Sequence, residues 1–213
     1  MTKILLVRHG YSLSNKDNTF TGQLDIPLSE LGKKQAELCS DYILKNYKID
    51  AIYSSDLSRA IDTVKKVADT LNLPIQICKE FREVYGGEWE GMEAAEISKK
   101  YPKLQSAWAN DVGRCRCPNG ESLIETGERA YKKLTEIAKK EAGKTIIVAT
   151  HAGAIRAMEC IIRKIAPQEM QKVAWVSNAS ITELEYDEKG FSEKKISFDE
   201  YLNDLKTKIT VFK

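Results

Sequence analysis

Apolar residues in this chain gather in short unbroken runs, and these runs alternate with longer stretches of helical periodicity. The clearest runs are residues 4–7 (Ile-Leu-Leu-Val) and 145–149 (Thr-Ile-Ile-Val-Ala). Their length and branched side chains predict strands that are buried on both faces. Weaker strand candidates lie at residues 50–54, 74–78, 179–186 and 191–198. The last two flank the turn Asp187-Glu-Lys-Gly190, and together they predict a hairpin at the edge of a sheet.

Between these runs, apolar residues recur at the three- and four-residue spacing that is typical of helices. Ser29 is a good N-cap residue and opens a predicted helix that runs to about residue 46. Ser122 and Glu125 form a capping box for a second long helix, to about residue 141. Further helices are predicted at residues 93–100, where Pro102 ends the pattern, at residues 152–165, and from the Ser54-Ser55-Asp56 cap to Leu71.

Strands that alternate with helices predict an α/β fold. We expect a three-layer α/β/α sandwich with a mainly parallel central sheet and an antiparallel edge strand. The chain is long enough to bury a sizeable core, and we expect one domain over residues 1–213. Residues 79–120 break the alternation with glycines, prolines and tryptophans, which predicts an excursion that covers the core edge and the functional site. Residues 16–27 form a predicted polar loop, and the charged tail from residue 199 has no assigned structure.

The ends of the predicted strands carry the candidate chemistry. Arg8, His9 and Gly10 follow the first strand, and His151 follows the strand at residues 145–149. Arg59 lies in the first turn of a helix that follows another strand. Ligands of parallel sheets bind beyond the carboxyl ends of the strands, so these side chains should meet at one rim. Arginine matches phosphate oxygens and neutral histidine is a nucleophile, which predicts a phosphate-handling site.

Composition and charge mainly exclude other functions. The chain is 42% hydrophobic and 30% charged, as in soluble globular proteins, and a net charge of +2 does not indicate nucleic-acid binding. Its apolar runs are too short to span a membrane, and the start of the chain does not resemble a signal peptide. Five scattered cysteines fit a cytoplasmic protein. Cys115 and Cys117 have no neighbouring ligands for zinc, so we expect neither a metal nor a cofactor.

The candidate residues belong to a longer ordered set. In chain order it comprises Leu6-Val-Arg-His-Gly10 with Ser12 and Asn15, Thr21-Gly22, Ser54-Ser-Asp-Leu-Ser-Arg-Ala60 with Thr63, Phe81-Arg-Glu83, Gly87, Trp89-Glu-Gly91, Asn119-Gly-Glu-Ser122 and Thr150-His-Ala-Gly153. Through this set the chain resembles the histidine phosphatase superfamily, the phosphoglycerate-mutase-like proteins. It is most similar to the phosphatase branch, which includes alpha-ribazole phosphatase and broad-specificity phosphatases. Tyr11 departs from the family pattern, which often has Glu or Gln there.

The resemblance implies a role for each matched side chain. His9 would be the nucleophile, and Glu83 would protonate the leaving oxygen and then help to activate water. The phosphate group would be bound by Arg8, Asn15, Thr21, Gly22, Arg59, His151 and Ala152. A cationic His151 is expected to contribute positive charge, and the helix after it to contribute amide donors. Glu88 and Glu90 are rival candidates for the acid.

The resemblance therefore implies a metal-independent phosphatase that acts on a small phosphomonoester through a phosphohistidine. A cofactor-dependent phosphoglycerate mutase is the alternative. Those mutases carry Arg-His-Tyr after the acid glutamate, whereas this chain has Val84-Tyr85-Gly86. A non-catalytic phosphate-binding scaffold is a remote third reading, because all the matched catalytic positions are filled.

Three points stay open from the sequence. Arg114 and Arg116 either bind a second anionic group of the substrate or form a solvated pair. Trp89 and Trp108 are expected to pack in the core rather than to form a platform for the substrate. The assembly is also open, with a homodimer as one expected form.

Overall fold

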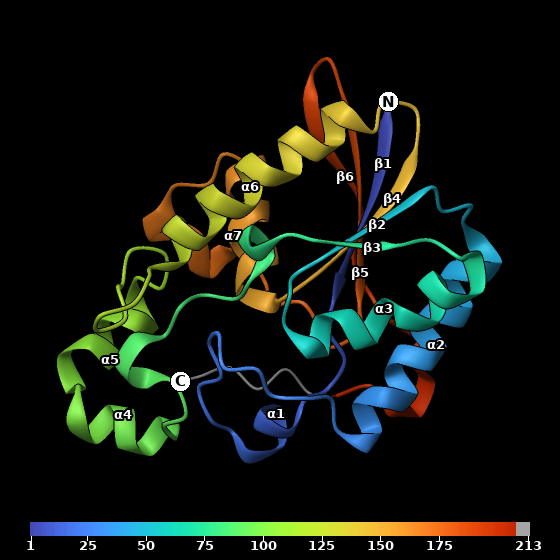
Figure 1. The fold of residues 1–213 in the computed structure, drawn as a ribbon. Helices are drawn as coiled ribbons and strands as arrows, with labels where there is room; N and C mark the ends of the chain where they lie inside the picture. The colour runs from blue at the N-terminus through green and yellow to red at the C-terminus, as the bar shows by residue number, and fades with distance from the viewer. Residues whose placement is uncertain (208–213) are drawn as a thin grey trace.

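The computed structural model describes residues 1–207, so the last six residues of the predicted domain 1–213 lie outside the described part. A six-stranded sheet with the order β3-β2-β4-β1-β5-β6 forms the centre of the fold (Figure 1). The strands are β1 Thr2–Arg8, β2 Ala51–Ser54, β3 Ile75–Ile77, β4 Thr145–Thr150, β5 Ile181–Asp187 and β6 Gly190–Phe198. The first four of this order pair in parallel, whereas β5 pairs antiparallel with both β1 and β6. The mainly parallel sheet with an antiparallel edge is confirmed, and β5 and β6 form the predicted edge hairpin.

The helices cover both faces of this sheet. They are α1 Leu13–Asp17, α2 Glu30–Asn46, α3 Ser58–Leu71, α4 Ala94–Lys100, α5 Pro102–Asn110, α6 Leu123–Lys140 and α7 Ala152–Ile162. Shorter 3₁₀ turns are η1 Lys79–Phe81, η2 Gly87–Trp89, η3 Pro167–Lys172 and η4 Glu200–Leu205. Figure 1 shows α6 and α7 on one side of the sheet and α2 and α3 on the other.

Alternation along β1 explains this three-layer arrangement. Successive side chains of a strand point to opposite faces. Ile4 and Leu6 belong to the core cluster formed with α6 and α7, whereas Leu5 and Val7 belong to the cluster formed with α2 and α3. All four side chains are fully buried. The predicted α/β/α sandwich is therefore confirmed, and burial on both faces explains the unbroken apolar run.

The helix caps were predicted correctly at α2 and α6 but not at α3. Ser122 and Glu125 form the expected capping box. The N-cap of α3 is Leu57, which provides no side-chain cap. Asp25 accepts from the Ser58 amide at 2.8 Å instead. Ser55 is buried at the end of β2 and faces the site, so the local capping pattern is overridden by a residue from another loop.

Several boundaries differ from the expected ones. The predicted polar loop at residues 16–27 begins two residues too early, because residues 16 and 17 belong to the short helix α1, whose N-cap is Ser12. Pro102 ends α4 as expected, but it also opens α5, because proline is well tolerated in the first turn of a helix. The helix α7 ends at Ile162, three residues before the predicted end. The tail contains the 3₁₀ turn η4.

The segment 79–120 carries its own hydrophobic cluster. Trp89 and Trp108 pack edge-on against Phe20, with ring centroids 5.6 Å apart in both pairs. The cluster joins this excursion to the inner side of α7 through Ala157 and to the start of α6 through Leu123. Trp89 has the expected packing role, whereas Trp108 packs in the same cluster and also lines the cavity described below.

Candidate active site

The predicted chemistry meets at one rim of the sheet. His9 follows β1 and His151 follows β4, and these strands are paired in register up to Arg8 and Thr150. The two imidazole ring centroids lie 5.2 Å apart. A single cavity is lined by Arg8, His9 and Arg59 together with Glu83 from the excursion. The structure thus brings together side chains from four distant parts of the chain.

The tautomer of His9 follows from its hydrogen bond. Its Nδ1 lies 2.7 Å from the Gly10 carbonyl oxygen. A carbonyl oxygen can only accept, so Nδ1 carries the proton and Nε2 keeps its lone pair. Burial lowers the pKa of His9 well below its ordinary value, and the charges of Arg59 and Arg8 lower it further. His9 is therefore neutral near pH 7, as a nucleophile must be.

The turn after His9 depends on a close backbone approach. A Cβ atom added to Gly10 would lie 2.6 Å from the carbonyl oxygen of Gly32 in α2. The Gly10 amide donates to the Thr63 hydroxyl at 3.0 Å, and this hydroxyl donates to the Arg59 carbonyl. Glycine thus allows the turn that holds the histidine ring in place.

Arg8 and Arg59 are buried cations without a direct carboxylate partner. Arg59 is only 1% exposed and donates to the carbonyl oxygens of Leu24 and Gly22, and Arg8 donates to that of Val176. Within residues 1–207 the Nε of each guanidinium has no hydrogen-bond partner, and neither group forms an ion pair. Burial lowers the pKa of each to about 10, and the nearby Glu83 only partly offsets this effect. Such an arrangement favours a bound anion.

His151 is neutral in this structure, contrary to the expected cationic form. The ring is fully buried, and its Nε2 lies 3.0 Å from the Ser55 hydroxyl oxygen. Its Nδ1 has no partner among the described residues. Burial lowers the pKa of His151 well below its ordinary value, and Arg59 and His9 lower it further. A motif does not report the desolvation of a ring, and the cationic form stays a prediction for the state with phosphate bound.

These two histidines predict a pH dependence of stability. An unfolded histidine binds a proton below about pH 6.5, whereas both rings stay neutral in the fold. The unfolded state therefore binds more protons in this range. The free energy of unfolding should fall as the pH is lowered from about 7 to about 5, by up to about 1.4 kcal/mol per pH unit for each ring.

Urea unfolding of the wild type and of His9→Phe at several pH values would test this expectation. Burial raises the pKa of Glu159 to about 7, and this carboxyl acts in the opposite direction. Its effect cancels in the difference between the two proteins. We expect the wild type to lose more stability on acidification than the variant. Parallel profiles would contradict a neutral, buried His9.

Glu83 is tied to the first turn of α7. Its carboxylate accepts from the Val84 amide at 2.9 Å and from the Gly153 amide at 3.0 Å. One of the amides that we expected to serve the phosphate thus serves this carboxylate. The rival acids lie elsewhere: Glu90 accepts from the Gly86 amide and Glu88 contacts Tyr101, and neither lines the cavity.

The remaining predicted residues line the same cavity, but they differ in their contacts. These residues are Asn15, Thr21, Gly22 and Ala152. The Asn15 side-chain oxygen caps α1 by accepting from Ser12, and it also accepts from Asn178. The Thr21 hydroxyl donates to Ser14, and the Gly22 carbonyl supports Arg59.

Sequence reasoning missed most of the cavity wall. The additional lining residues are Ser14, Asn18, Thr19, Phe20, Val84, Trp108, Leu123, Gly153 and Trp175. They come from separate segments and have no shared local signal. Arg114 and Arg116 do not line the cavity. Arg114 forms an ion pair with Asp111 and Arg116 forms one with Glu125, and both arginine side chains are exposed to solvent. The solvated-pair reading of these two arginines is therefore correct.

No helix within residues 1–207 combines the length and the apolar character that crossing a bilayer requires. Among the same residues no group of three or more His, Cys, Asp or Glu side chains is arranged to hold a metal ion.

Comparison with known proteins agrees with this geometry. Residues 4–199 match the family described as histidine phosphatase superfamily (branch 1). Phosphoserine phosphatase 1 of Hydrogenobacter thermophilus is 36% identical over 164 residues, 76% of each chain. The 2,3-bisphosphoglycerate-dependent phosphoglycerate mutase 2 of Gloeobacter violaceus is 32% identical over 179 residues, 81% of each chain.

A solved phosphatase structure has the same fold. Mycobacterial glucosyl-3-phosphoglycerate phosphatase in complex with VO3 superposes with a TM-score of 0.82 at 27% identity, over 90% of this chain and 96% of that one. Both phosphatases and mutases thus occur among the relatives. On the family match and the shared fold together, the chain belongs to the histidine phosphatase superfamily.

Proposed function

We propose that this chain is a metal-independent phosphatase that hydrolyses a small phosphomonoester through a phosphohistidine at His9. The observation that carries the proposal is the pair of buried guanidinium groups, Arg8 and Arg59, beside a neutral His9. Two buried cations without an ion-pair partner among residues 1–207 favour a dianion between them, and the phosphoryl group of a monoester is such a dianion.

In the first step, His9 Nε2 attacks phosphorus while the bond to the leaving oxygen breaks. Glu83 gives its proton to that oxygen, so the product alcohol leaves neutral. Arg8 and Arg59 stabilise the charge on the other phosphoryl oxygens, which is the main requirement of phosphoryl transfer. The Nδ1 proton stays on the ring throughout and is donated to the Gly10 carbonyl oxygen.

In the second step, water attacks the phosphohistidine and Glu83 takes a proton from it. Inorganic phosphate leaves, and His9 returns to its neutral form. A bound dianion would oppose the burial effect at His151 and favour a protonated ring there. We therefore infer that His151 takes up a proton when the substrate binds, which restores its expected cationic role in the complex.

The residues after the acid favour a phosphatase over a mutase. The mutase pattern places two further basic side chains directly after the glutamate, and here Val84 and Tyr85 stand in those positions. Arg114 and Arg116 are paired with their own carboxylates and are not available as a substitute. The aromatic rings of Phe20, Trp108 and Trp175 suit a substrate with some apolar surface.

A substrate screen tests this choice. Phosphoserine, aryl phosphates and 3-phosphoglycerate should release inorganic phosphate at different rates, and at least one should be a good substrate. 3-Phosphoglycerate should be measured with and without 2,3-bisphosphoglycerate. Fast isomerisation that needs the bisphosphate, with little release of phosphate, would make the chain a mutase instead.

Metal independence gives a separate prediction. Arginine and histidine side chains supply the charge that a metal supplies in other phosphatases. Hydrolysis of p-nitrophenyl phosphate should therefore be unchanged, within about a factor of two, after dialysis against excess EDTA. Loss of activity in EDTA that a divalent ion restores would refute the proposed chemistry.

We also propose that the chain acts as one domain in the cytoplasm. The support for this location is that all five cysteines are buried and free, as expected for a reducing compartment. A homodimer remains an expectation, which sedimentation of the purified protein would test.

A further inference from the structure

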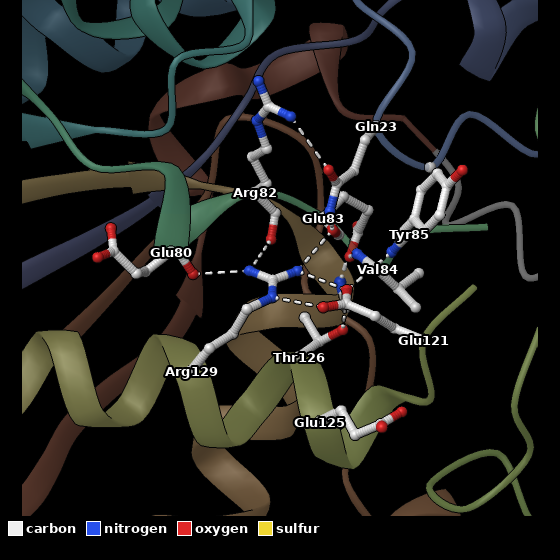
Figure 2. Close-up of polar contacts among 12 residues, drawn as sticks. Gln23, Glu80, Arg82, Glu83, Val84, Tyr85, Glu121, Glu125, Thr126 and Arg129 are labelled. Carbon is white, nitrogen blue, oxygen red and sulfur yellow. Dashed lines mark hydrogen bonds and ion pairs between the residues drawn. The ribbon is translucent and has the colours of Figure 1, made fainter. Parts of the chain in front are cut away.

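The segment that carries Glu83 has little regular structure of its own. Between η1 and η2 the backbone runs as an irregular loop, so its carbonyl groups cannot be satisfied within a helix or strand. One side chain, Arg129, donates to the carbonyl groups of Glu80, Arg82 and Glu83, and Gln23 Nε2 adds a further donor to the Glu83 carbonyl at 3.1 Å. Figure 2 shows Arg129 rising from α6 with its guanidinium directed at this loop.

All five N–H groups of Arg129 have an acceptor. Nη1 donates to the carbonyl oxygens of Glu80 at 2.7 Å and Arg82 at 2.9 Å. Nη2 donates to the Glu83 carbonyl at 2.8 Å and to the Glu121 carboxylate at 2.9 Å. Nε donates to the other Glu121 carboxylate oxygen at 2.9 Å. A guanidinium has five donors, so its hydrogen-bonding capacity is fully used.

Glu121, the carboxylate partner of Arg129, contacts the backbone that follows Glu83 in the chain. Its carboxylate accepts from the Tyr85 amide at 3.0 Å, and its backbone amide donates to the Tyr85 carbonyl at 2.8 Å. Burial acts to raise the pKa of Glu121, but the hydrogen bonds from Arg129 and the Tyr85 amide outweigh it and the pKa is lowered. The carboxylate is therefore ionised at neutral pH. Arg129 and Glu121 together hold the backbone on both sides of Glu83.

Arg129 itself does not touch the substrate site. It is absent from the cavity wall, and its side chain is 22% exposed on the outer side of the loop. Glu83, in contrast, lines the cavity, and within residues 1–207 its carboxylate accepts hydrogen bonds from the Val84 and Gly153 amides. The position of its carboxyl group thus depends on where the loop backbone is held.

We propose that Arg129 is a positioning residue that, with Glu121, holds Glu83 in register with the leaving oxygen. This inference rests on the proposed role of Glu83 as the acid. General acid catalysis needs the acid within hydrogen-bond reach of the oxygen, and a displacement of about 1 Å can cost about 10²-fold in rate. Lysine has three donors around one point and cannot bridge three carbonyl groups and a carboxylate.

The test compares leaving groups. Arg129→Lys should slow hydrolysis of an alkyl phosphate by about 10- to 100-fold, because a poor leaving group needs the acid. Hydrolysis of p-nitrophenyl phosphate should fall by less than about 3-fold, because its leaving oxygen needs little protonation. The KM values should change little. In Glu83→Gln, the added Arg129→Lys change should cause no further loss on the alkyl substrate.

Arg163→Lys is the matched control. Arg163 is likewise a partly buried arginine, 27% exposed, that forms ion pairs with Glu159 and Glu193, but it lies at the far end of α7. It should show no dependence on the leaving group. If Arg129→Lys does not fold, Glu121→Gln provides the test, because it removes the ionic half of the contact and should give the same selectivity.

The outcomes separate this inference from the proposed function. Equal losses on both substrates in Arg129→Lys, with a selective loss in Glu83→Gln, would overturn the positioning role alone. A Glu83→Gln variant without any selectivity would overturn the assignment of the acid, and the role of Arg129 would fall with it. Additive losses in the double variant would mean that Arg129 acts on something other than Glu83.

Discussion

Replacement of His9 by alanine is expected to reduce turnover to the background rate, a loss of about 10⁴-fold or more. The imidazole is the proposed nucleophile, and its Nε2 lone pair is free because Nδ1 donates to Gly10. No neighbouring group has the same position, since His151 lies with its ring centroid 5.2 Å away. Steady-state assays on the best substrate of the screen measure the effect.

Trapping of the intermediate tests the same step directly. A phosphoramidate is stable in base and labile in acid, so an alkaline quench during turnover should leave labelled phosphate on His9. His151→Ala should slow turnover without moving the label. Label on Ser12, Ser55 or an acidic residue, or substantial activity in His9→Ala with an unchanged circular dichroism spectrum, would show that the nucleophile is another group.

Glu83→Gln is expected to give the second largest effect, and one that depends on the substrate. General acid catalysis typically contributes about 10²–10⁴-fold, so alkyl phosphates should slow by this factor. Activated aryl phosphates should lose much less. The side-chain oxygen of the glutamine can still accept a hydrogen bond from one of the two amides that hold Glu83. The loop around residue 83 should therefore stay folded. Rates over a series of leaving groups provide the measurement.

Glu88→Gln serves as the control for this variant. Glu88 is a nearby carboxylate on the same excursion, it contacts Tyr101 and Asn119, and it does not line the cavity. Its replacement should leave the leaving-group dependence unchanged. A selective loss in Glu88→Gln, with equal losses in Glu83→Gln, would transfer the acid role to Glu88.

Most of the regular elements could be predicted because their signals are local. The run at residues 4–7 reflects burial on both faces of β1, and the capping box at Ser122 reflects the free amides of the first turn of α6. The parallel sheet then followed from the alternation of strands and helices. The same logic placed His9, His151 and Arg59 at one rim, because parallel strands end together.

Local signals failed where a distant residue took over a local task. Asp25 caps α3 from another loop, although Ser55 is nearer in the sequence. Asn178 donates to the His9 carbonyl and to Asn15, and nothing around residue 178 marks it as part of a site. Phe20 and Trp175 line the cavity, but the sequence does not identify them as site residues, since aromatic residues also pack in ordinary cores.

The sequence by itself determined the layers of the fold, the strand ends that carry the candidate side chains and the choice of the proposed reacting groups. These properties depend on periodicity, on caps and on the ordered set of residues, all of which can be recognised along the chain. Only the tertiary structure decided the protonation of His9 and His151, the lack of an ion pair at Arg8 and Arg59 within residues 1–207, and the contacts of Arg129 with the backbone around Glu83. Each of these depends on desolvation or on contacts between distant segments, which arise only when the chain has folded.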